Sequence, residues 1–264
     1  MGTCALCHVN AKLCRSHVMP KFGYQPILKL PGGRLRNWGA PKRPVQDGLK
    51  DWLLCVNCEG LLGKAETHFH KDIFQPLYHV DEEARAFGYG NWLLRFTVSV
   101  SWRNLLIHMR QSKLQHASEE QVRLIDQALE TWRKFLLSET RNVGQFQQHL
   151  LLGELQEVTL STSPDVQPIL SRYLGRSSDM TVVIHTDRTV FVYSMFPKVV
   201  IIGFINVREP ERWEGTRVKV GTGLLPKKRT IPSYFQEFLL HRAQRGREHF
   251  DKALENQSGE GSNF

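Results

Sequence analysis

The chain of 264 residues is long enough for one large domain or two small ones. Its 41% hydrophobic and 23% charged residues are typical of a soluble globular protein. No stretch approaches the roughly 20 apolar residues that span a bilayer. The opening MGTCALCHVN lacks the regions of a secretory signal, and Leu6 stands where a myristoylation site needs Ser or Thr. These features exclude a membrane-spanning protein and predict a cytoplasmic one.

Positive charge is concentrated near the N-terminus. The formal net charge is +9, and residues 1–80 carry 11 Lys or Arg against 5 Asp or Glu, so 11 − 5 = +6 belongs to that segment. A basic segment attracts polyanions, of which nucleic acid is the most common. The charge therefore favours a nucleic-acid partner for the first 80 residues.

The five cysteines form two matched pairs and one remainder, Cys14. In each pair two residues separate the cysteines, and two such pairs present four thiolates to one tetrahedral ion. A disulfide framework is not expected in a reducing compartment. We therefore predict a structural Zn²⁺ site formed by Cys4, Cys7, Cys55 and Cys58.

A short strand and a long loop separate the two cysteine pairs. The strand ends at His17-Val18-Met19-Pro20. Residues 24–48 contain four prolines and four glycines, and this density of breakers predicts an irregular loop. As candidate nucleic-acid contacts the loop carries, besides Trp38, the cations Arg34, Arg36, Lys42 and Arg43. A solvated surface loop is an equally good interpretation of these cations.

A helix is predicted over residues 57–74, beginning at the second cysteine pair. Apolar residues recur at helical spacing along one stripe, formed by Cys58, Leu62, Ala65, Phe69 and Ile73. Three residues with metal-ligating side chains share the neighbouring face, namely Glu59, Glu66 and His70. The pattern therefore predicts a helix that buries one stripe and presents two carboxylates and an imidazole beside it.

Two further helices are predicted before the pattern changes. Residues 90–111 are apolar and predict a buried helix, although Thr97–Val100 would also suit a strand. Residues 118–138 repeat apolar side chains every three or four positions and predict an amphipathic helix. The tryptophans of both segments, Trp92, Trp102 and Trp132, are expected in the core.

Strands dominate the remaining pattern. Runs of β-branched and aromatic residues predict an antiparallel meander over residues 181–186, 189–196, 198–207 and 217–220. A final helix is predicted over residues 232–255, before a disordered tail over 255–264. The predicted fold class is α+β, with a zinc module over residues 1–80 and a helical and antiparallel-β domain over 81–254.

The order of the N-terminal motifs resembles a family of nucleases. A CxxC pair, the sequence Ser16-His17-Val18-Met19-Pro20 and a helix-opening CxxC pair follow one another within residues 4–74. This order is similar to the zinc-containing HNH, or His-Me finger, endonucleases. The resemblance implies a treble-clef module in which a β-hairpin lies against a helix with the active site between them. Beyond residue 80 the chain is similar to uncharacterised bacterial proteins with the same N-terminal layout.

The resemblance also implies catalytic roles. His17 would be the general base that activates water, a task for which imidazole is suited near neutral pH. The Asn that orients this base in the family falls near Asp47 or Asp51, and Asp51 is the candidate catalytic residue.

A catalytic ion, Mg²⁺ or Mn²⁺, is implied as well. Ser16 occupies the position of an Asp that binds this ion in the family, and Glu59 occupies the position of the usual Asn. A carboxylate binds Mg²⁺ at least as well as an amide does. Glu66 and His70 would complete the ion site from the same helix face.

Other interpretations of these residues stay open. Cys4, Cys7, Cys14 and His17 form an alternative zinc set that would leave the second cysteine pair unused. Glu66 and His70 would also suit a solvated pair one helical turn apart, and Glu59 would suit the helix N-terminus through the macrodipole.

These features predict a metal-dependent endonuclease that hydrolyses phosphodiester bonds in DNA. The alternative is a non-catalytic zinc module that binds nucleic acid or a protein partner, and Ser16 in place of Asp is its best support. The C-terminal domain is a candidate for association with a protein partner or with a second copy of the chain. A side chain of His17 that faces away from the helix would favour the binding module.

Overall fold

The computed structural model describes residues 1–31, 33–37, 40–79, 86–111, 114–152, 167–185, 189–213, 215–226 and 232–259. Two antiparallel strand pairs hold the N-terminal cysteines: β1 (Gly2–Thr3) with β2 (Asn10–Ala11), and β3 (Leu13–His17) with β6 (Lys50–Cys55). Together with the helix that follows, these strands are called the N-terminal module below.

Helix α2 (Val56–Phe69) follows β6 without a gap and continues as a π-helical turn over His70–Phe74. The apolar stripe predicted for this helix is buried along its length, from Cys58 to Ile73. The predicted helix is therefore confirmed, and its stripe faces the protein core. A short helix, α3 (Pro76–His79), follows the turn.

The segment between β3 and β6 is more regular than predicted. A 3-10 turn at Lys21–Gly23 leads into α1 (Gln25–Lys29), and β4 (Leu35–Asn37) pairs with β5 (Ala40–Val45). The prediction of an irregular loop over residues 24–48 is therefore wrong in part. Proline is compatible with the first turn of a helix and with the edge strands of a two-stranded sheet, so its density did not exclude either element.

Four antiparallel strands form the central sheet, in the order β8 (Gln148–Leu152), β11 (Val199–Asn206), β10 (Val190–Phe196) and β9 (Asp179–Ile184). The last three strands confirm the predicted meander. The strand predicted over residues 217–220 is wrong, because Arg217 forms only an isolated bridge to His149. The fourth strand is β8, which was not predicted. All five of its residues are buried, so its sequence lacks the alternation of apolar and polar residues that indicates a strand.

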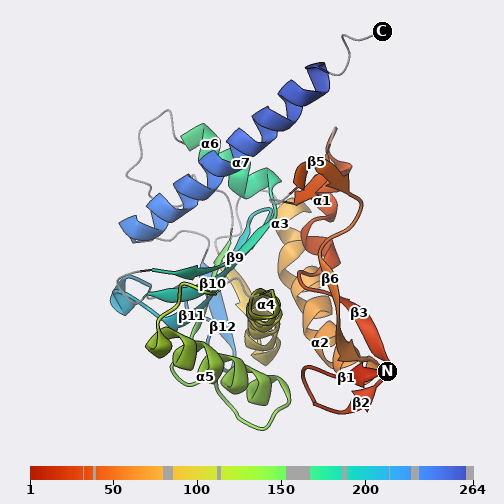
Figure 1. Cartoon of the computed structure of the whole chain (residues 1–264). Coiled ribbons are helices and arrows are strands. Elements are labelled where there is room, and N and C mark those ends of the chain that lie inside the picture. The colour runs from red at the N-terminus through yellow and green to blue at the C-terminus, as the bar shows by residue number, and fades with distance from the viewer. Residues whose placement is uncertain are drawn as a thin grey trace.

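Helices cover both faces of this sheet (Figure 1). One face packs on α4 (Asn91–Arg110) and α5 (Glu119–Leu136), and the other on α6 (Gln167–Arg176) and α7 (Ser233–Gly259). Successive side chains of a strand point to opposite faces, and helices cover both faces of this sheet. Strand β10 is therefore buried along its whole length. Val192 faces the α4 side, whereas Phe191 and Tyr193 face the α7 side.

The predicted helices are present with small changes at their ends. Both α4 and α5 lie within their predicted ranges, and α5 begins with a capping box between Ser118 and Gln121. Helix α7 continues to Gly259, so residues 255–259 of the predicted disordered tail are helical, and residues 260–264 lie outside the described ranges. One more strand pair joins β7 (Ala86–Tyr89) to β12 (Gly223–Pro226), and a 3-10 turn covers Pro210–Trp213.

The N-terminal module shares its apolar core with the rest of the chain. The ring of Phe69 in α2 stacks on Phe96 in α4, with ring centroids 4.0 Å apart. Side chains of α2, α4, α5 and one face of the sheet belong to one continuous cluster, so the two predicted domains bury a common core. No helix within the described ranges has both the length and the apolar character needed to cross a membrane.

His149 in β8 is a buried imidazole next to a cation. It is 2% exposed, and its Nδ1 lies 2.7 Å from Oγ1 of Thr216. Burial and the nearby Arg217 lower the pKa of His149 to about 3. The folded protein therefore holds this imidazole neutral.

The buried imidazole makes stability depend on pH. The unfolded chain, in which a histidine has a pKa of about 6.5, binds more protons than the folded chain once the pH falls below that value. Lowering the pH from about 7.5 to about 5.5 is expected to decrease the free energy of unfolding by about 1.4 kcal/mol through His149. Urea denaturation at both pH values, compared between the wild type and His149→Gln, measures this term. An equal pH dependence in both proteins would contradict it.

Candidate functional site

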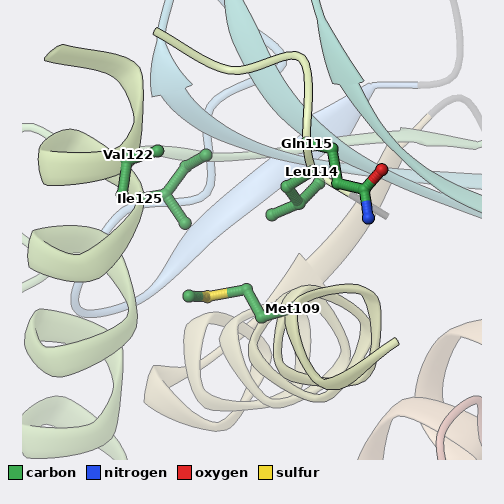
Figure 2. Close-up of a pocket in the computed structure, with 5 residues that line it drawn as sticks. All are labelled: Met109, Leu114, Gln115, Val122 and Ile125. Atoms are coloured by element: carbon green, nitrogen blue, oxygen red, sulfur yellow. The ribbon is translucent and has the colours of Figure 1, made fainter. Parts of the chain in front are cut away.

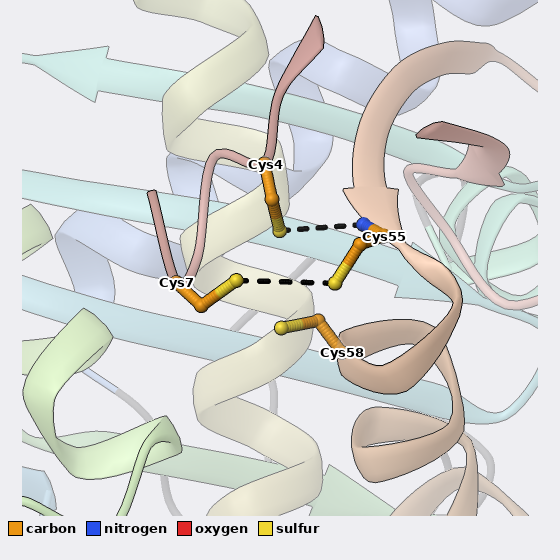
Figure 3. A group of neighbouring side chains, drawn as sticks. All are labelled: Cys4, Cys7, Cys55 and Cys58. Atoms are coloured by element: carbon orange, nitrogen blue, oxygen red, sulfur yellow. Dashed lines mark hydrogen bonds between the residues drawn. The ribbon is translucent and has the colours of Figure 1, made fainter. Parts of the chain in front are cut away.

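The four predicted zinc ligands come together in the structure. The sulfur atoms of Cys4, Cys7, Cys55 and Cys58 all lie within 4.8 Å of one another (Figure 3). The Sγ atoms of Cys7 and Cys55 are 3.8 Å apart. Zinc–sulfur bonds of about 2.3 Å in a tetrahedron set neighbouring sulfurs about 3.8 Å apart. The cluster therefore has the size and the donor atoms to hold a metal ion such as zinc.

The backbone explains how cysteines distant in sequence meet. A tight turn joins Cys4 to Cys7, in which the amide of His8 donates to the carbonyl of Cys4 at 2.9 Å and His8 itself has a φ of 62°. Cys55 ends β6, and Cys58 lies in the first turn of α2. The amide of Cys55 also donates to Sγ of Cys4 at 3.3 Å, which connects the two halves of the cluster.

The thiols of the cluster differ in acidity. Burial opposes ionisation of Cys4, but hydrogen bonds from the backbone at Cys7, Cys55 and Leu6 lower the pKa of its thiol to about 7. Burial raises the pKa of the Cys7 thiol, and burial together with the neighbouring sulfurs raises the pKa of the Cys58 thiol far above its usual range. Four thiolates in one place repel each other, and a bound dication compensates that repulsion.

The alternative zinc set is wrong. Among the described residues, the four cysteines above form the only group of three or more His, Cys, Asp or Glu side chains close enough to hold a metal ion. Neither Cys14 nor His17 belongs to that group. Cys55 and Cys58 therefore belong to the candidate metal cluster, as predicted.

Ser16 and His17 point to opposite faces of the β3–β6 pair. Ser16 is 1% exposed, and its Oγ donates to Oε2 of Glu59 at 2.6 Å, so it faces α2. Since consecutive strand residues alternate, His17 lies on the other face, and its side chain is 23% exposed. The candidate base therefore faces away from the helix residues that were predicted to hold an ion.

Asp47 is the partner of His17. Its Oδ1 lies 3.0 Å from Nε2 of His17, and it also accepts hydrogen bonds from the hydroxyl of Tyr24 and from the amide of Gly48 at 2.9 Å. Lys50 forms an ion pair with its other oxygen. Of the two candidate orienting residues, Asp47 is therefore the one that contacts His17. Asp51, the residue named as catalytic from the sequence, instead pairs with Arg110 at 3.1 Å.

The surroundings of Asp47 keep its carboxyl group ionised. Burial opposes this charge, but hydrogen bonds from Lys50, Tyr24 and His17 hold the pKa of Asp47 well below its usual range. Burial and the same carboxylate raise the pKa of Tyr24 above its usual value. Because a carboxylate only accepts hydrogen bonds, Nε2 of His17 carries a proton, and Nδ1 is the basic nitrogen of the neutral imidazole.

Glu59, Glu66 and His70 do not converge on a common ion. Glu59 accepts the hydrogen bond from Ser16, and the ring of His70 lies 4.9 Å from that of Phe22. Glu66 forms an ion pair with Arg103, which also donates to the carbonyl of His17 at 2.9 Å. These three residues therefore do not fit the predicted Mg²⁺ or Mn²⁺ site.

The predicted nucleic-acid contacts are only partly described. Arg34 is exposed, whereas the side chains of Arg36, Lys42 and Arg43 lie outside the described part of the chain.

Sequence patterns did not indicate Arg103, which is 2% exposed. A cation inside the apolar run 90–111 is the signal that could have identified it, because a charge in such a position needs a buried partner.

An apolar pocket of about 210 Å³ lies elsewhere, between α4 and α5 (Figure 2). It is lined by Met109, Leu114, Gln115, Val122 and Ile125. These side chains offer neither a nucleophile nor a titratable group. This pocket therefore offers no catalytic group.

No protein-family model, curated protein sequence or solved structure matches this chain significantly. Its function is therefore inferred from its own residues and their geometry.

Proposed function

We propose that the N-terminal module is a zinc-stabilised endonuclease that hydrolyses phosphodiester bonds in DNA. The observation that supports it best is the contact of 3.0 Å between Nε2 of His17 and Oδ1 of the ionised Asp47. A carboxylate that fixes the tautomer and orientation of an imidazole is the recurring arrangement of a general base. Nδ1 of His17 would accept the proton of the attacking water.

In this proposal zinc has a structural role. The cysteine cluster joins the β1–β2 turn, the end of β6 and the first turn of α2, and this connection supports the treble clef that the proposal assigns to the module. Four sulfur ligands would complete the coordination of such an ion, so no position would remain for water or substrate. Zinc would thus fix the strand pair that carries His17 rather than take part in hydrolysis.

The second candidate is a zinc module that binds nucleic acid without cleaving it. Three observations favour it. The side chain of His17 faces away from α2. Glu66 forms an ion pair with Arg103, and Ser16 donates to Glu59 at the place where the nuclease family would bind an ion. Phosphodiester hydrolysis generally needs a cation to absorb charge on the phosphate. In this candidate His17 and Asp47 would have a structural role.

Cleavage assays separate the two candidates. Purified protein is incubated with plasmid DNA and with single-stranded DNA, in Mg²⁺, in Mn²⁺ and in a chelator that spares the structural zinc. The nuclease proposal expects cleavage that falls at least about a hundredfold in His17→Ala. His68→Ala is the matched control, because this histidine also lies on the module, in a pair with Asp72, and is 58% exposed. Binding without cleavage under every condition would support the second candidate instead.

A further inference from the structure

The outer face of the β3–β6 pair carries an unusual combination of side chains. Residues directly opposite in an antiparallel pair project to the same face. Arg15 is opposite Trp52, and His17 is opposite Lys50. These four residues therefore share one face, called the hairpin face here, while Ser16 points inward to α2.

Trp52 contributes little to the core. Its exposed fraction is 58%, whereas Trp102, Trp132 and Trp213 are at most 2% exposed. A single exposed apolar residue needs no explanation by itself. Here, however, the exposed ring lies across the strand pair from a cation and on the same face as the candidate base.

The charges of the hairpin face are suited to phosphate. The side chain of Arg15 is exposed and forms no hydrogen bond or ion pair with any other residue in the described part of the chain. The acidic neighbour, Asp47, is neutralised by Lys50. The cationic side chain of Arg15 is thus available to a ligand, and the segment of residues 1–80 has a net charge of 11 − 5 = +6.

We propose that the hairpin face binds single-stranded DNA, with an unpaired base stacked on Trp52 and a phosphate held by Arg15. This inference rests on the proposed function and specifies its substrate. An exposed indole beside cations is the arrangement that binds unpaired bases without sequence preference. In a duplex both faces of a base are already stacked, so Trp52 would gain nothing without unpairing it.

The position of the ring also places the bound strand near the candidate base. Two residues along a strand span about 6.8 Å, which is the separation from the Arg15–Trp52 pair to the His17–Lys50 pair. A base on Trp52 would therefore belong to a nucleotide adjoining the phosphate at His17. Trp52 acts here as a positioning residue, not as a catalytic one.

Binding to a labelled oligonucleotide tests the inference. Fluorescence anisotropy is measured in a chelator that prevents cleavage but spares the structural zinc, with a single strand of about 15 nucleotides and with its duplex. Trp52→Ala is expected to weaken single-strand binding about tenfold to a hundredfold and to change duplex binding little. Trp52→Phe should keep most of the affinity because it keeps a ring. Leu224→Ala is the control, since Leu224 is 72% exposed on β12 and its loss should have no effect.

The phosphate contact has its own readout. Arg15→Gln is expected to reduce the slope of log affinity against log salt by about 0.7 for the single strand. Unchanged single-strand affinity in Trp52→Ala, or an equal loss for strand and duplex, would overturn the inference. Cleavage decides the proposed function separately. Binding that depends on Trp52 without any cleavage would support this inference and contradict the nuclease proposal. Cleavage that Trp52→Ala leaves unchanged would support the nuclease proposal and overturn this inference.

Discussion

Removal of zinc is expected to unfold the N-terminal module and to destabilise the whole chain. Structural zinc contributes an apparent binding free energy of about 10 kcal/mol or more at neutral pH, and a preformed site does not exist in the unfolded chain. The cluster joins segments that are 48 residues apart in sequence, such as Cys7 and Cys55. Without the ion, repulsion between thiolates would keep most of these thiols protonated, and only their own weak contacts would join these segments.

Cys58→Ser and Cys14→Ser form a matched pair for this test. Cys58 belongs to the cluster, whereas Cys14 is a free cysteine outside it. The first variant should lose bound zinc and melt at a lower temperature, and the second should retain one zinc per chain. Metal analysis and circular dichroism during heating measure both quantities. Equal zinc content in the two variants, or an unchanged melting temperature after chelation, would refute a structural zinc site.

The structural effect of losing the ion is expected to extend beyond the N-terminal module. Phe69 of α2 stacks on Phe96 of α4, and both belong to the cluster of buried residues that reaches the central sheet. A disordered α2 would expose part of that shared surface, so the protein is expected to unfold in a single cooperative transition. His17 would lose its support at the same time, because β3 pairs with the strand that ends at Cys55.

Local patterns predicted the features that depend on local geometry. The stripe from Cys58 to Ile73 follows from the 3.6-residue period, and the cluster follows from two equal cysteine spacings. The meander strands β9 to β11 were visible for the same reason, since β-branched runs separated by turns need no long-range information.

Long-range pairing decided the features that the sequence left open. The strand pairing shifts register between Cys14 and Arg15, so the position of His17 relative to α2 could not be counted from the cysteines. Asp47 and Asp51 are four residues apart, and only the path of the chain brings Asp47 to His17 and Asp51 to Arg110. Arg103 contacts the carbonyl of a residue 86 positions earlier, a distance that no periodicity can reveal.

The contact between Arg103 and Glu66 should make Glu66→Ala strongly destabilising. Arg103 is 2% exposed, and its guanidinium donates to Glu66, to the carbonyl of His17 and to the carbonyl of Ser99. Removing the carboxylate would leave a buried charge without its counter-ion, which costs about 3–5 kcal/mol. Because the side chain of Glu66 is itself 23% exposed and water can reach it, a value of about 3 kcal/mol is expected.

Asp51→Asn is the matched control for this ion pair. Asp51 and Arg110 are each about two-fifths exposed, at 38% and 40%, and such surface pairs contribute at most about 1 kcal/mol. Urea denaturation without added divalent ions should therefore rank Glu66→Ala well below Asp51→Asn in stability. A ligand for a catalytic ion would behave differently, because its removal would change the Mg²⁺ or Mn²⁺ dependence of cleavage and spare the stability of the metal-free protein. Observation of that second pattern would return Glu66 to the ion site that its sequence position first indicated.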